Sequence, residues 1–463
     1  MHWTIVASKE LQPVISKFAF LLEDMGINDS DDYDTSFSAS ETDPGTGHRI
    51  YLGYHESPTP EEYRIKTEHR DGCNLITVTG SDYNGLLYGY ADFVNRYIPH
   101  WENTDSTNPY YFRPVFSDAP IRSYERTSSP KVARRGCWTW GHVMQNPGGY
   151  FENMVNCKMN TCVIWNNHVP TNAKKIVEGA HRNGIRLLWG FAWGWSTSIN
   201  AESMQDHLNR KDEVVREYLE NYAPLGGDGI YFQSFTETSS ETLGGRLIAE
   251  VVTEYVNDIA GKILAVQPDL TIQFGLHATS VKEKLSYIAK VDPRIEIVWE
   301  DCGAFPFAYI PKNTDGFDST LEIARDMSIL RGRGDRFGCV YKGLCCLDWS
   351  KFSYPPEPYP IGGDRDPIRY RDEIQKYIAE KQKIFHYVQA HWLKNAESCR
   401  AMTEMLCREK DGDLTILALV EDSAFEYRCW FPVLLLGEIL WDPEQNTDDM
   451  IRDLALSPAA VFA

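Results

Sequence analysis

The stretch TCVIWNNHVPTNAKKIVEGAHRNGIRLLWGF, residues 161–191, decides the fold because it contains one complete strand–helix–strand unit. Its two ends, Thr161–Trp165 and Arg186–Phe191, are short apolar runs with the length of buried strands. The segment between them is typical of an amphipathic helix, and Gly184 stands where that helix must stop before the second strand. A unit of this kind joins two parallel strands of one sheet.

The same alternation of strand and helix continues from Arg135 onward. It gives eight strands over roughly three hundred residues, which predicts a (β/α)8 barrel. A doubly wound sheet is the competing α/β fold, but no Gly-rich phosphate loop follows any of the strands. The predicted strand cores are Gly136–Gly141, Thr161–Trp165, Arg186–Phe191, Gly229–Phe235, Thr271–Leu276, Glu296–Trp299, Phe337–Leu344 and Leu414–Val420.

A different pattern precedes the barrel. Residues 1–115 mix strand-like and helical segments, which is typical of a small α+β domain with helices packed on a sheet. Residues 116–134 are predicted to be a linker, and residues 135–463 to be the barrel with a C-terminal helical segment. The strands predicted in the first domain are Trp3–Ala7, His48–Gly53, Glu62–Glu68 and Asn74–Thr79, and the helices are Leu11–Met25 and Leu86–Tyr97.

Composition excludes several classes of partner. The chain of 463 residues has a formal net charge of −20, so we expect repulsion from nucleic acid and from acidic membrane surfaces. The most apolar stretch, Cys429–Trp441, is too short to span a bilayer and contains Glu438. The start, MHWTIVASKE, does not resemble a secretion signal, and the 11 cysteines lack zinc-like spacing. We predict a soluble cytoplasmic protein with reduced cysteines and no cofactor; a leader removed from the sequence stays an alternative, and the oligomeric state is open.

Functional residues in a (β/α)8 barrel lie at the carboxyl ends of its strands. Here these positions combine indoles, amides and carboxylates, which suit a carbohydrate substrate, because flat apolar rings stack on sugar C–H faces and polar groups bind hydroxyls. The indoles form two pairs with a spacing of two, so each pair faces one way, and one pair can belong to the barrel core. The candidate binding residues are Trp138, Trp140, Asn166, Asn167, His168, Trp193, Trp195, His277, Lys342, Asp348 and Trp349.

Three acids are candidates for glycosidic cleavage, which needs a proton donor and a second carboxylate. Glu237 follows the aromatic strand segment YFQSF. Burial among aromatic side chains would favour the protonated form of its carboxyl group, so we expect Glu237 to be the proton donor. The alternative is that Glu237 caps the next helix. Glu300 and Asp301 follow the sixth strand and point in different directions, so we expect one of them to be the nucleophile or base; the alternative is that both are structural.

The remaining polar candidates are three histidines and one lysine. His142, His168 and His277 follow three different strands, but no HxH or HExxH spacing supports a metal, so no metal site is predicted. Binding of sugar hydroxyls or loop packing accounts for them more simply. Lys342 follows the seventh strand and can hold an acidic ligand group or pair with Asp301 or Asp348, and the sequence does not decide between these roles.

Parts of the chain resemble known glycoside hydrolases. The segment EEYRIKTEHRDGCNLITVTGSDYNGLLYGYADFVNRY, residues 61–97, resembles the α+β domain ahead of the barrel in β-N-acetylhexosaminidases and α-glucuronidases. RRGCWTWG and the following YFENMVNCKMN resemble the first barrel units of these enzymes, and GEILWDPEQNTDDMI, residues 437–451, is similar to the segment after the barrel in α-glucuronidases. The resemblance implies a glycoside hydrolase.

One position departs from the hexosaminidase pattern. Those enzymes carry an Asp–Glu pair after the fourth strand, whereas Thr236 precedes Glu237 in this chain. Cleavage assisted by the substrate's acetamido group would lack its orienting Asp, and the α-glucuronidase pattern fits Glu237 with Glu300 and Asp301 better. We therefore expect a glycosidase acting on an oligosaccharide or glycoside. The alternatives are a catalytically inactive carbohydrate-binding barrel and a metal-dependent lyase or isomerase.

Overall fold

The structure is a computed structural model. It describes residues 2–26, 36–98, 120–193, 209–233, 242–243, 245–276, 284–300, 316–342, 344, 358–362, 367–411, 413–420, 425–426, 429–455, 457 and 460–461. The chain divides into two units. The first contains Met1–Pro130 together with Val155–Lys158 and Asp448–Val461, and the second contains Lys131–Met154 and Met159–Thr447, with the last two residues of the chain.

The first unit is built on a six-stranded mixed sheet with the order β2-β1-β3-β5-β4-β6. The four strands predicted here are confirmed, but two more strands join the sheet. Ser36–Ser40 was not predicted, and Tyr124–Ser128 lies within the predicted linker. The strands are β1 (His2–Val6), β2 (Ser36–Ser40), β3 (His48–Tyr54), β4 (Tyr63–Arg70), β5 (Cys73–Gly80) and β6 (Tyr124–Ser128).

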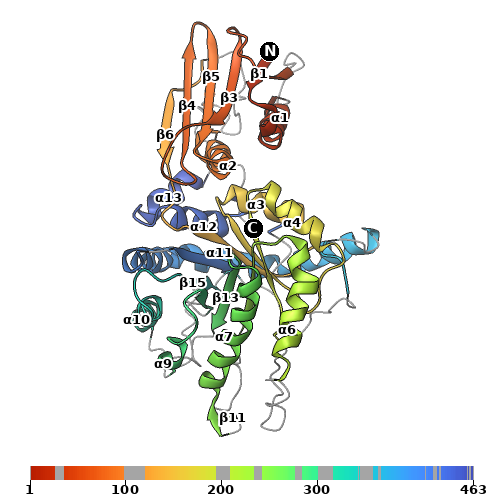
Figure 1. Ribbon diagram of the computed structural model, residues 1–463. Coiled ribbons are helices and arrows are strands. Elements are labelled where there is room, and N and C mark those ends of the chain that lie inside the picture. Colours follow the sequence, from red (N-terminus) through yellow and green to blue (C-terminus); the bar gives the residue numbers. More distant parts are fainter. Residues whose placement is uncertain are drawn as a thin grey trace. The chain divides into compact units, whose positions relative to one another are not determined.

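Two helices, α1 (Gln12–Gly26) and α2 (Tyr83–Asp92), lie beside this sheet (Figure 1). The α2 helix begins at Asp82, whose carboxylate accepts a hydrogen bond from the Gly85 amide at 2.8 Å. This contact satisfies one of the amides that a helix leaves unpaired at its start. A π-helical turn, Phe93–Tyr97, continues α2, so the helical stretch that was predicted to end at Tyr97 is confirmed.

The second unit is a closed barrel of eight parallel strands, one at each of the eight predicted positions, although the described strands begin or end up to three residues from the predicted bounds. Figure 1 shows helices around its strands. The barrel strands are β7 (Arg134–Trp140), β8 (Thr161–Trp165), β9 (Arg186–Gly190), β10 (Gly229–Gln233), β13 (Thr271–Leu276), β14 (Ile295–Trp299), β15 (Phe337–Tyr341) and β16 (Leu414–Leu419). Together the two units give the predicted fold class, an α/β barrel with an additional mixed-sheet domain.

Helices connect the barrel strands. Gly184, with φ of 68°, ends the helix before β9 in the left-handed conformation that glycine adopts easily, as predicted. The connecting helices are α3 (Pro147–Asn156), α4 (Ala173–Arg182), α6 (Lys211–Glu217), α7 (Ile248–Val266), α9 (Leu285–Ile288), α10 (Phe317–Ser328) and α11 (Pro367–Glu409). Two more helices, α12 (Phe431–Trp441) and α13 (Thr447–Leu454), follow the last barrel strand, and nearly all of α13 belongs to the first unit. The short pieces are Lys9–Leu11, Tyr218–Tyr222, Ala223–Leu225, β11 (Thr242–Leu243), β12 (Arg246–Leu247), β17 (Cys429–Trp430) and β18 (Ala460–Val461).

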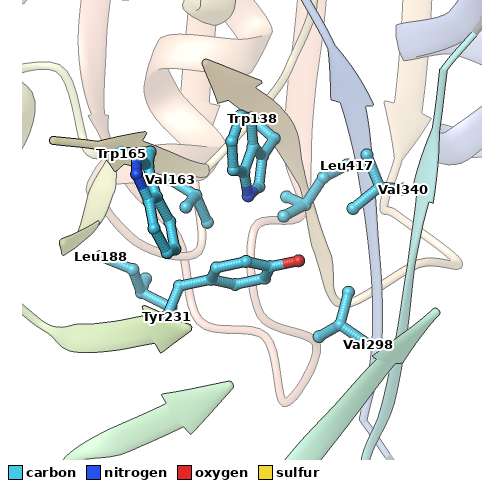
Figure 2. Packing of buried hydrophobic residues seen from close by; sticks show 8 residues of the cluster. All are labelled: Trp138, Val163, Trp165, Leu188, Tyr231, Val298, Val340 and Leu417. Carbon is cyan, nitrogen blue, oxygen red and sulfur yellow. The ribbon is translucent and has the colours of Figure 1, made fainter. Parts of the chain in front are cut away.

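Side chains fill the barrel interior. Successive residues of a strand point to opposite faces, so every second side chain of the barrel strands faces inward. The inward residues form one buried cluster (Figure 2), and three of them are large aromatic side chains rather than the usual branched aliphatic ones. The cluster consists of Trp138, Val163, Trp165, Leu188, Tyr231, Val298, Val340 and Leu417.

Six of the eight cysteines among the described residues are buried. Burial raises the pKa of Cys137 to about 12, so this thiol stays protonated at neutral pH and acts as a small apolar core residue.

In the parts of the chain that the structure describes, every helix is too short or too polar to cross a lipid bilayer.

Candidate active site at the carboxyl end of the barrel

Glu300 is the best-defined acid at the carboxyl end of the barrel. It follows β14 and lies two residues after the inward-facing Val298, so its side chain belongs to the inward set. Only 2% of the residue is exposed. Its Oε1 atom accepts a hydrogen bond from the Tyr231 hydroxyl, and its Oε2 atom lies 3.6 Å from the ammonium nitrogen of Lys342. Both carboxylate oxygens therefore face a donor.

Gly275 of β13 makes room for the contact between Tyr231 and Glu300. A Cβ atom at this position would lie 2.2 Å from the Tyr231 hydroxyl oxygen and 2.3 Å from Glu300 Oε1. Both distances are far below van der Waals contact, so any side chain here would force the pair apart. The site therefore depends on a glycine in a strand, which marks a close approach of other groups.

Three indoles line the barrel interior beside this pair. The ring centroids of Trp138 lie 5.0 Å from Trp140 and 6.3 Å from Trp165, and those of Trp140 and Trp165 are 5.8 Å apart. The Tyr231 ring packs edge-on against Trp138 at 5.9 Å, and Figure 2 shows its hydroxyl pointing toward the side of Val298. Trp140 is partly exposed. One tyrosine thus contacts both the indole cluster and the buried acid.

A second polar group, Asn166, follows β8. It is 1% exposed, and its Oδ1 atom accepts a hydrogen bond of 2.5 Å from the Tyr359 hydroxyl. Its Nδ2 donor is buried without a hydrogen-bond partner among the described residues. Tyr359 belongs to residues 358–362, where Ile361 exchanges backbone hydrogen bonds of 2.7 and 2.9 Å with the Asn172 side chain. This segment therefore reaches the loop after β8.

Trp193 lies apart from the cluster of Trp138, Trp140 and Trp165. Its ring stacks on Phe232 at 3.9 Å, and Phe232 stacks on Phe274 at 4.7 Å. Tyr231 faces the barrel interior, so its neighbour Phe232 faces outward. The Tyr255 hydroxyl of α7 donates to the Trp193 carbonyl oxygen at 2.7 Å. Trp193 thus packs between the barrel wall and α7, and its part in sugar binding stays a prediction.

The other predicted residues fall into two groups. Asn167 and His168 are exposed at the end of β8, and His142 is buried beside Trp140 at a ring distance of 5.6 Å. The remaining candidates, Glu237, Trp195, His277, Asp301, Asp348 and Trp349, lie outside the described residues. The structure therefore brings Glu300 and Lys342 together near Trp138 and leaves the role of the second group as a prediction.

Three residues of the site were not predicted. Trp165 and Tyr231 lie in predicted strands, where the alternation shows which residues share a face but not which face is inward. Tyr359 gave no comparable signal, because its contact with Asn166 joins residues 193 positions apart. Among the residues with described positions, no three His, Cys, Asp or Glu side chains are arranged to hold a metal ion.

The arrangement supports chemistry on a ring-shaped ligand. Indoles offer stacking surfaces, Asn166 Nδ2 offers a donor, and Glu300 offers a carboxylate in a site that is largely shielded from water. A buried carboxylate paired with a lysine and a phenol is suited to stabilising positive charge or attacking an electrophilic carbon.

No protein-family profile matches the chain, and no curated protein matches it by sequence. Solved structures do match its fold. A family 20 β-N-acetylglucosaminidase superposes with a TM-score of 0.50 at 10% identity, covering 88% of this chain and 89% of that one. CpGH84B gives 0.43 at 12% identity, covering 73% and 58%, and a family 89 glycoside hydrolase from Clostridium perfringens gives 0.45 at 9%, covering 89% and 48%. This chain thus spans about half the length of these last two proteins, and the comparison shows a glycoside-hydrolase-like fold.

Proposed function

We propose that the protein is a glycoside hydrolase that cleaves a glycosidic bond in an oligosaccharide or glycoside by carboxylate acid/base catalysis. One observation carries the proposal: the buried Glu300 carboxylate stands at the carboxyl end of a (β/α)8 barrel, joined through Tyr231 to a cluster of indoles. This end of the barrel is where enzymes of this fold place their chemistry. The fold shared with a β-N-acetylglucosaminidase supports the same class of reaction.

The two steps of the reaction need different carboxyl groups. Glu300 serves as the second carboxylate, which acts as nucleophile or base or stabilises the positive charge that develops on the sugar. Glu237 comes four positions after β10 in the sequence and lies outside the described residues; its sequence context supports a role as the proton donor. Asp301 lies outside the described residues, and its role as the alternative second carboxylate stays a prediction.

The sugar is bound by stacking and by a small number of polar contacts. Trp140, which is partly exposed, provides the stacking surface and is backed by the buried Trp138, and Asn166 Nδ2 donates to a ligand oxygen. Because Thr236 replaces the orienting Asp of acetamido-assisted enzymes, N-acetylhexosaminides are one substrate class to test and not the assumed one. The panel should also contain glucuronides and neutral hexosides.

The test is a comparison of three carboxyl-to-amide variants on a panel of aryl glycosides. Glu237→Gln and Glu300→Gln are each expected to lower kcat/KM by about 10² to 10⁴-fold on a substrate that the parent cleaves. Glu178→Gln is the matched control, since Glu178 is exposed on α4, and it should retain full activity. Full activity in Glu300→Gln, or a parent protein that binds sugars and cleaves none of the panel, would overturn the proposal.

A further inference from the structure

We infer that Lys342 and Tyr231 are positioning residues that hold Glu300 as an anion, so that Glu300 cannot be the proton donor of the reaction. The inference rests on the proposed function and deepens it, because it separates the roles of the two carboxyl groups. It is carried by the geometry around Glu300, where each carboxylate oxygen has its own donor on a different barrel strand or strand end.

The donors differ in kind and in exposure. The Tyr231 residue is fully buried and belongs to the interior cluster, so its hydroxyl is fixed by packing. The Lys342 side chain is 23% exposed, whereas the Glu300 side chain is 3% exposed. The ammonium group therefore keeps part of its hydration while it neutralises a carboxylate that has lost nearly all of its own, and this lowers the cost of burying the negative charge.

A hydrogen bond and a cation that contact a carboxylate both favour its ionised form. Within the described part of the chain, the elements next to Glu300 contribute Tyr231 from β10, Lys342 from the end of β15 and Gly275 from β13, which brings no charge. A proton donor needs the opposite environment, one that keeps the carboxyl group protonated at the working pH. Glu300 is therefore suited to be the nucleophile, base or charge-stabilising group.

The first experiment measures the charge of Glu300 without substrate. The carboxyl carbon of Glu300 is observed by ¹³C NMR in protein labelled at glutamate, and its signal is assigned by its loss in Glu300→Gln. We expect Glu300 to give the signal of an ionised carboxylate in the parent near neutral pH. The midpoint of its titration should lie about one pH unit or more higher in Lys342→Met than in the parent. Lys342→Arg should restore most of the difference.

Lys211→Met is the matched control. Its ammonium group lies 2.9 Å from the Asp258 carboxylate and the side chain is also 23% exposed, but the pair lies on α6 and α7 outside the barrel. This variant should leave the Glu300 titration unchanged. Equal midpoints in the parent and in Lys342→Met, or a protonated Glu300 near neutral pH, would overturn the inference, provided that circular dichroism shows both variants folded.

The second experiment uses turnover on the substrate found with the aryl glycoside panel. Lys342→Met and Tyr231→Phe should lower kcat more than they raise KM, and the acidic limb of the kcat profile should move to higher pH in Lys342→Met. If the parent cleaves nothing, the proposed function fails while the NMR titration still tests the inference. If Glu300→Gln abolishes hydrolysis but neither Lys342→Met nor Tyr231→Phe shifts the profile, the function stands and the inference fails.

Discussion

A single glycine controls the geometry of the candidate site. Gly275→Ala would place a methyl group at 2.2 Å from the Tyr231 hydroxyl and at 2.3 Å from Glu300 Oε1, so we expect both the contact and the activity to be lost. Overpacking of this kind costs about 1–3 kcal/mol in the free energy of unfolding, which urea denaturation would measure.

The control for this substitution is a glycine with free space around it. Gly261 lies inside α7, and a Cβ there would meet nothing within 4 Å. Gly261→Ala should therefore leave turnover unchanged and raise the free energy of unfolding by about 0.5–1 kcal/mol, because alanine loses less freedom in a helix. Equal effects of the two substitutions would show that the close approach at Gly275 does not matter.

Tyr255 gives a prediction about alkaline pH. Burial raises its pKa from 10.0 to about 12, since the ionised form would lose its hydration. Between about pH 10 and pH 12 the unfolded chain loses this phenolic proton while the folded chain keeps it, so the free energy of unfolding falls as the pH rises. Urea denaturation at a series of pH values should show a smaller fall in Tyr255→Phe than in the parent. Identical slopes would contradict the assignment.

At the scale of elements, the anchoring of residues 358–362 can be tested. Asn172→Ala removes the two hydrogen bonds to Ile361 and so weakens the anchoring of the segment that carries Tyr359. We expect a rise in KM with a loss of no more than about 1–2 kcal/mol in the free energy of unfolding, since hydrogen bonds of this kind contribute modestly. Asn183→Ala is the control. It removes a side-chain hydrogen bond of 3.0 Å to the Gly179 carbonyl oxygen. This contact lies at the end of α4 that leads into β9, away from the site, so KM should stay unchanged.

The elements that sequence reasoning identified share a physical property. Each barrel strand is apolar on both faces because one face meets the interior and the other meets the helices, so its pattern is visible in the sequence. The missed strands β2 and β6 have the sequences SFSAS and YERTS and hold no buried residue. Their position is decided by hydrogen bonding to β1 and β4, which leaves no apolar signature.

The residues of the site also differ in whether the sequence alone predicts them. Glu300 and Lys342 were predicted because the rule that strand ends carry function needs only the strands. The partnership of Tyr231 with Glu300 joins residues 69 positions apart, and it depends on the register of β10, β13 and β14 across the barrel. Trp193 was chosen because it follows the third strand, and its spacing of two from Trp195 shows only that the two share a face, not which face it is.

At the scale of the whole molecule, the first unit is not made by the N-terminal residues alone. Asp92 is fully buried and meets Arg96 at 3.2 Å, Arg126 at 3.0 Å and Lys158 at 3.5 Å, and Lys158 is supplied by residues 155–158, far along the chain. Asp453, near the C-terminal end, also binds Arg96. Three distant segments thus share one charged cluster.

Replacement of Asp92 should therefore lower the free energy of unfolding strongly. Asp92→Ala would leave three cations without their common partner, and we expect a loss of about 3–5 kcal/mol in the free energy of unfolding, measured by urea denaturation. Asp43→Ala removes the partner of Arg49 at 3.1 Å, but the Asp43 side chain is 45% exposed, so a much smaller loss is expected. A loss of similar size in both variants would show that the burial of the cluster has no energetic weight.

The aromatic lining of the barrel also has an optical consequence. Indoles whose rings lie 5.0–6.3 Å apart, as in Trp138, Trp140 and Trp165, exchange excitation energy and couple their electronic transitions. The fluorescence emission and the circular dichroism of these indoles should therefore change when a ligand displaces water from Trp140. Titration of unlabelled sugars against this intrinsic signal would rank ligands before any cleavable substrate is known.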